Sequence, residues 1–81
     1  MIIVWDEPKR LANIDKHGFD FADIPLEFFE TALIGMAKGG RWFALGQIGM
    51  AVVVIFVVLG SEGISIVSAR PASRRERMAI K

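Results

Sequence analysis

The chain has no cysteine and a single histidine, His17, and these two shortages exclude several kinds of site. Without cysteine there are no disulfides to hold the fold and no thiolates to bind a metal ion. One histidine cannot build a histidine-rich metal site within one chain. The sequence also lacks a glycine-rich phosphate loop, a paired-carboxylate pattern and a Ser-His-Asp arrangement. We therefore expect any chemistry here to be free of metal and assisted by arginine.

Charge is missing from the middle of the chain, where the nineteen residues 42–60 carry no charged side chain. A helix of that length could span a bilayer. However, three glycines and Gln47 interrupt the stretch, and residues 52–58 are almost all β-branched, which favours a strand. The N-terminus also lacks the basic region of a signal peptide. We expect a cytoplasmic protein without membrane association, and a small membrane protein spanning residues 42–60 is the alternative.

Length and composition indicate a single domain over residues 1–81, because 53% of the 81 residues are hydrophobic and supply one small core. The first five residues are typical of a strand. Asp6 and Gly18 are typical of the two ends of a helix, and Leu11 and Ile14 are expected to face the core. A second helix is expected over about residues 20–31. Its apolar stripe is formed by Phe21, Ile24 and Phe28.

Strands are predicted in the second half of the chain, over residues 31–37, 41–48, 51–59 and 64–70, joined by short turns. The continuous apolar run in the third of these segments is typical of a strand buried on both faces. Ser73 and Glu76 match a capping box, which predicts a short C-terminal helix. The predicted fold class is α+β, with a small antiparallel β-sheet packed against two N-terminal helices and a short C-terminal helix.

Arginine is concentrated near the C-terminus, where residues 68–77 read SARPASRRER. The guanidinium group binds phosphate in a planar, two-pronged way. Arg70 ends the last predicted strand, and Arg74 and Arg77 share one side of the following helix, so the three could form one anion-binding corner. The alternative is a solvated surface. Residues 38–81 carry seven basic and two acidic side chains, whereas residues 1–37 carry three basic and seven acidic ones, which suggests two different partner surfaces.

His17 lies at the end of the first predicted helix, and imidazole is the side chain best suited to moving a proton near neutral pH. Lys9 and Lys16 could join it at a substrate. The alternative is that His17 is a polar helix end, where its cation is favoured by the helix dipole, and that both lysines are solvated.

Two motifs at opposite ends of the chain resemble those of the BrnT toxins. The segment WDEPKRLANIDKHGFDF is similar to the opening of that family, and ISIVSARPASRRER is similar to its ending. The matching residues are Trp5, Asp6, Lys9, Asn13, Lys16, His17, Gly18 and Phe21 in the first motif, and Ile66, Ser68, Ala69, Arg70, Ala72, Arg74, Glu76 and Arg77 in the second.

The resemblance implies a RelE-like fold and an endoribonuclease that arrests translation without a metal or other cofactor. It also implies neutralisation by a BrnA-like ribbon-helix-helix antitoxin, in a heterotetramer with two copies of each protein, and contact with operator DNA only through that antitoxin. A non-catalytic antitoxin-binding or RNA-binding module of the same fold is the alternative. The catalytic residues expected on this basis are His17, Lys16, Arg70, Arg74 and Arg77, and the expected substrate-binding residues are Lys9, Ser68 and Arg41.

The middle of the chain departs from the family pattern because residues 43–56, FALGQIGMAVVVIF, are unusually hydrophobic. Apolar surface that a small domain does not bury within itself commonly serves association. We therefore assign the extra apolar surface to contact with the antitoxin or to self-association.

Overall fold

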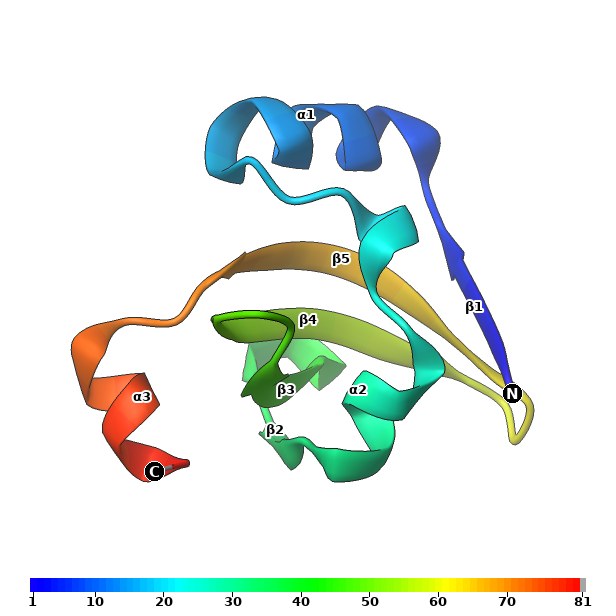
Figure 1. Ribbon diagram of the computed structural model, residues 1–81. Coiled ribbons are helices and arrows are strands. Elements are labelled where there is room, and N and C mark those ends of the chain that lie inside the picture. Colours follow the sequence, from blue (N-terminus) through cyan, green and yellow to red (C-terminus); the bar gives the residue numbers. More distant parts are fainter. Residues whose placement is uncertain (81) are drawn as a thin grey trace.

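The computed structural model describes residues 1–80. Within this range it has five strands, three α-helices and two short 3-10 helices (Figure 1). The elements follow one another as β1 (Ile2–Trp5), α1 (Glu7–His17), η1 (Phe21–Asp23), α2 (Leu26–Thr31), β2 (Leu33–Met36), η2 (Lys38–Gly40), β3 (Trp42–Gln47), β4 (Ala51–Leu59), β5 (Gly63–Pro71) and α3 (Arg74–Ala79).

The five strands form one sheet in the order β1-β5-β4-β3-β2. The four later strands make the expected antiparallel meander, but β1 pairs with β5 in parallel, so the sheet is mixed and the prediction of an antiparallel sheet is only partly correct. The reason lies in the segment between β1 and β2. Helices α1 and α2 carry the chain to the far edge of the sheet, and β5 then returns beside β1 in the same direction (Figure 1).

Local capping signals determine where the helices begin and end. The Asp6 carboxylate accepts a hydrogen bond from the backbone N–H of Lys9, and Gly18 ends α1 in the left-handed conformation, as predicted. The predicted capping box of α3 is confirmed, because Ser73 and Glu76 exchange two hydrogen bonds. The second helix differs from the prediction, since extended backbone at residues 24–25 divides it into η1 and α2.

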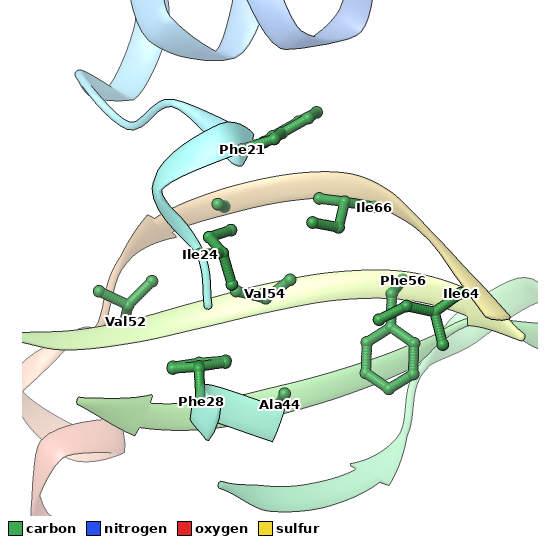
Figure 2. Packing of buried hydrophobic residues seen from close by; sticks show 10 residues of the cluster. Phe21, Ile24, Phe28, Ala44, Val52, Val54, Phe56, Ile64 and Ile66 are labelled. Carbon is green, nitrogen blue, oxygen red and sulfur yellow. The ribbon is translucent and has the colours of Figure 1, made fainter. Parts of the chain in front are cut away.

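The sheet buries apolar side chains on both faces. Val52 and Val54 of β4 belong to one hydrophobic cluster and Val53 to another, and because side chains alternate along a strand the two clusters lie on opposite faces. The larger cluster lies beneath η1 and α2 and contains the predicted stripe of Phe21, Ile24 and Phe28 (Figure 2). We call its side of the sheet the α2 face, and the side of the smaller cluster the α3 face.

Helix α1 does not contribute the side chains that were expected of it. Leu11 is 56% exposed, so its predicted place in the core is wrong, and Ile14 is half-buried. The one residue that α1 buries is Asn13. This pattern follows from the position of α1, which packs along β5 and places a polar group against the strand.

Strand β5 contains an irregularity that the sequence did not predict. Ile55 of β4 pairs with Ser68 and the next residue, Phe56, pairs with Ile66, so Val67 is an extra residue in β5. Such a bulge bends its strand and changes the direction of the neighbouring side chains. As a result, Ile66 and Ala69 both face the larger cluster although they are three positions apart.

The uncharged stretch at residues 42–60 forms β3, a tight turn and β4 rather than a helix, so the alternative of a membrane-spanning helix there is wrong. Along residues 1–80 no helix combines the length and apolar character that crossing a membrane requires.

Candidate functional site

A pocket of about 320 Å³ lies where α1 meets β5, at the edge of the sheet. Three parts of the chain line it: α1, the residue just before β3, and the bulged part of β5. We call it the basic pocket. Its lining residues are Lys9, Ala12, Asn13, Lys16, His17, Arg41, Val67 and Ser68.

The pocket exists because β5 is longer than its neighbour β1. Strand β1 pairs with β5 only from Gly63 to Ile66, whereas β5 continues to Pro71. Beyond Ile66, the edge of β5 is therefore without a strand partner on that side. The bulge at Val67 lies at the point where the pairing with β1 ends, and it places Val67 and Ser68 in the pocket wall.

The side chain of Asn13 takes the place of the missing strand. Its Nδ2 donates to the carbonyl of Ala69 at 2.8 Å, and its Oδ1 accepts from the N–H of Ala69 at 3.1 Å. Nδ2 also donates to the carbonyl of Phe19 at 2.9 Å, and the Ser68 hydroxyl lies 3.5 Å from Oδ1. A buried amide thereby satisfies both backbone groups of one strand residue and fixes α1 to β5. Sequence reasoning gave Asn13 no such role.

Lys9 and Lys16 reach the same pocket because they are two helical turns apart and share the Asn13 side of α1. His17 is the last residue of α1 and is half-buried, whereas both lysines are exposed. Arg41 directly precedes β3, which is separated from β5 by β4, so only the folded sheet brings Arg41 near α1.

The electrostatic character of the basic pocket is set by Lys9, Lys16 and Arg41, with His17 beside them, while no carboxylate is among its lining residues. Clustered positive groups in a concave surface concentrate anions there. The structure thus brings together five of the eight site residues predicted from the sequence: His17 and Lys16 from the catalytic set and Lys9, Ser68 and Arg41 from the substrate-binding set.

Arg70 is placed elsewhere, in a two-pronged ion pair with Glu76. Its Nη1 donates to Oε1 at 2.8 Å and its Nη2 to Oε2 at 2.9 Å. This guanidinium, together with the N–H of Ser73, lowers the pKa of Glu76 from its ordinary 4.5 to about 2. Arg70 therefore connects the end of β5 to α3, and it lines a different, largely apolar pocket on the α3 face.

Arg74 and Arg77 lie on the exposed part of α3 and line a third hollow together with Gln47. The predicted convergence of Arg70, Arg74 and Arg77 beside His17 is wrong, because the three arginines line two pockets and the imidazole lines another. The physical reason is the position of α3. It packs through Ile80 against the α3 face and so carries its arginines away from α1.

A second ion pair that the sequence did not reveal supports the loop after α1. Arg10 donates from Nε and Nη2 to both carboxylate oxygens of Asp20, at 2.8 and 3.0 Å, and from Nη1 to Glu7 at 2.7 Å. The guanidinium lowers the pKa of Asp20, while the same pairing raises the pKa of Arg10. Asp20 is also the N-cap of η1, so this pair positions η1 relative to α1.

Comparison with known proteins identifies both a protein family and a similar solved structure. A family model described as "Ribonuclease toxin, BrnT, of type II toxin-antitoxin system" matches residues 5–76, a range that contains every residue lining the basic pocket. A solved structure, the 1.1 Å crystal structure of the Brucella abortus ribonuclease toxin BrnT, is similar with a TM-score of 0.84 and 47% sequence identity. That match covers 89% of this chain and 96% of the Brucella chain. No curated protein matches the sequence.

Proposed function

Because the chain belongs to the BrnT family of ribonuclease toxins of type II toxin–antitoxin systems, we propose that it is a metal-independent endoribonuclease whose reaction takes place in the basic pocket. The observation that carries this proposal is the meeting of Lys9, Lys16, Arg41 and His17 around a space of about 320 Å³. RNA offers an anionic phosphate beside a hydroxyl group, and this set of side chains supplies the charges and the proton carrier that its cleavage needs.

The proposed reaction is an internal transesterification. The ribose 2′-oxygen attacks the adjacent phosphorus and loses its proton, and the bond between phosphorus and the 5′-oxygen breaks as that oxygen gains a proton. The products are a 2′,3′-cyclic phosphate and a 5′-hydroxyl. The protein has three tasks in this reaction: accepting one proton, donating another and stabilising the additional negative charge on the phosphorane.

We assign the proton transfers to His17 and Lys16, which are neighbours at the C-terminal end of α1. Stabilisation of the phosphorane falls to Arg41, because it is the guanidinium among the lining residues, and not to the arginines near α3 as the sequence had suggested. Lys9 and the Ser68 hydroxyl line the same space and are assigned to binding the substrate. Asn13 positions the site by holding α1 against β5.

Independence from metal ions is supported by the composition of the pocket wall. Divalent cations such as Mg²⁺ bind to oxygen ligands, chiefly carboxylates. The lining residues supply three fixed positive charges and no carboxylate, so a cation entering this space would meet repulsion without the usual ligands.

The biological setting follows from the family. We propose that cleavage of cytoplasmic RNA arrests translation, and that a BrnA-like ribbon-helix-helix antitoxin neutralises the chain in an assembly with two copies of each protein. Operator DNA would then be contacted only through the antitoxin.

The test is the chemistry of the product ends. Purified chain is incubated with a single-stranded RNA in excess EDTA, and the fragments are probed for 2′,3′-cyclic phosphate and for 5′-hydroxyl ends that polynucleotide kinase can label. Both kinds of end are expected at undiminished yield with the chelator. Cleavage that EDTA abolishes, products that carry a 5′-phosphate, or binding of RNA without cleavage would each refute the proposal.

A further inference from the structure

The α3 face of the sheet carries an apolar groove of about 360 Å³ between α3 and the edge strand β2. We call it the α3 groove. Its floor consists of side chains from β3 and β4. One wall is formed by Leu33 of β2 and by Ala37, which follows β2, and the other wall is α3. The apolar residues of the floor and the β2 wall are Leu33, Phe43, Leu45, Val53 and Ile55.

Helix α3 covers only part of this face. Its end packs through Ile80 against the smaller cluster of Leu45, Ala51, Val53 and Ala72, and the rest of the groove stays open. Leu33 is 48% exposed, and Phe43 and Ile55 are only half-buried. Contiguous apolar surface of this kind is uncommon on a small domain unless another molecule covers it.

Among the charged lining residues, the one that is not paired with another lining residue is positive. Arg75 lines the groove, is exposed, and makes no hydrogen bond or ion pair with any other residue in the described range 1–80. Glu76 is the only acidic lining residue, and its carboxylate is already occupied by both arms of Arg70. An occupant that offers apolar side chains with acidic ones beside them would therefore complement both the floor and the rim.

The backbone of the floor decides what form that occupant takes. Strands β3 and β4 have a strand partner on each side, so the floor offers no free backbone groups for a peptide strand to pair with. A helix satisfies its own backbone hydrogen bonds and presents only side chains. Recognition in this groove is therefore suited to the apolar face of an amphipathic helix.

We propose that the α3 groove is the docking surface for an acidic amphipathic helix of the antitoxin. The proposal rests on the proposed function only for the identity of that partner. The groove and the basic pocket share no lining residue, although Arg70 of the groove and Ser68 of the pocket are two positions apart on β5. Docking would use the α3 face of the sheet and cleavage the edge of the sheet beside α1. Because the two sites share no residue, a substitution can impair one activity without the other.

The experiment measures binding of the full-length antitoxin encoded beside this chain, by isothermal titration calorimetry, to the wild-type chain and to Leu33→Glu and Arg75→Glu. Both residues are exposed and lie outside the basic pocket, so both variants are expected to fold and to cleave RNA as the wild type does. Each is expected to weaken binding by roughly 10- to 100-fold, the loss typical of a residue important to an interface. Reversing an acidic residue of the antitoxin helix to lysine is expected to restore binding to Arg75→Glu.

The matched control is Met36→Glu, which places the same new charge on the same strand but on the α2 face. Met36 is 77% exposed, and the control is expected to bind the antitoxin like the wild type. Wild-type affinity for both groove variants, or an equal loss in the control, would overturn the proposal. So would a dimer of the chain alone, seen by light scattering, that Leu33→Glu dissociates, because the occupant would then be a second copy. If the variants bind as predicted but no RNA is cleaved, only the ribonuclease proposal fails.

Discussion

Replacing Asn13 with alanine is expected to remove a large share of the stability of this chain. The substitution takes away both partners of Ala69, at 2.8 and 3.1 Å, and the donor to the Phe19 carbonyl at 2.9 Å. A buried backbone group left without a partner costs about 1–3 kcal/mol. Because water can enter through the adjoining pocket and satisfy part of the loss, we expect a decrease of roughly 2–4 kcal/mol in the free energy of unfolding. That is substantial for a domain whose total is about 5–15 kcal/mol.

The assay is urea unfolding followed by circular dichroism, with Asn13→Asp and Leu11→Ala alongside. The aspartate variant keeps an acceptor for the N–H of Ala69 but loses the donor, so it is expected to be destabilised as well. Leu11→Ala changes an exposed side chain of the same helix and is expected to alter stability by less than about 0.5 kcal/mol. An unfolding midpoint of Asn13→Ala equal to that of Leu11→Ala would refute the reasoning.

The remaining predictions concern α3 and the core. Arg70 holds the pKa of Glu76 at about 2 instead of 4.5, so the pair stabilises the fold fully above pH 4.5 and its contribution disappears as the pH falls toward 2. Both side chains are about one-third exposed, so solvent screening weakens the pair, and Glu76→Gln is expected to cost about 1–2 kcal/mol of stability at pH 7. The variant is also expected to lose less stability below pH 4.5 than the wild type does. An unchanged pH profile in thermal melts would contradict this. Substituting alanine for Arg74 and Arg77 together is expected to change the cleavage rate of a short RNA by less than about threefold, because exposed charges outside the pocket contribute under 1 kcal/mol; a loss of a hundredfold would return them to the site. Gly46→Ala is expected to destabilise by about 1–3 kcal/mol, since the new methyl would lie 2.9 Å from a buried aromatic ring of α2; an unchanged melting temperature would show that α2 can shift to admit it.

Local features of the sequence predicted most of the elements because each is determined by short-range chemistry. Asp6, Gly18 and the pair of Ser73 and Glu76 marked helix ends, and the β-branched run at residues 51–59 became β4 with the same bounds. The parallel pairing of β1 was missed because it depends on the path of two intervening helices. The division of the second helix followed from the extended backbone at Ile24 and Pro25, because a proline restricts the residue before it to extended conformations.

Spacing along the chain explains the predicted site only where its residues share one element, whereas Arg41 and Ser68 were expected from the resemblance to the family. Lys9, Lys16 and His17 are neighbours on α1, and their common location follows from helical spacing. Arg41 reaches them only through the order of strands in the sheet. The arginines of the last segment were grouped by their proximity in sequence, but Glu76 binds one of them and α3 carries the others away.

Asn13 was missed for a different reason. Its partners on β5 are 56 positions away, and a single amide on a polar helix gives no local sign of burial. Asn13 is one of the residues that match the family motif, but that match alone did not show that its side chain pairs with the edge of a strand.

The central claim is that the basic pocket carries out the cleavage, and single-turnover cleavage of one RNA in EDTA tests it most directly. Arg41→Ala and His17→Ala are expected to slow the reaction by roughly 10²- to 10³-fold, because each removes charge stabilisation or a proton transfer in the transition state. Lys38→Ala is the control, since it removes an equal charge three residues from Arg41 but outside the pocket, and it is expected to cleave at the wild-type rate. Wild-type rates in both pocket variants, with the fold intact by circular dichroism, would contradict the account.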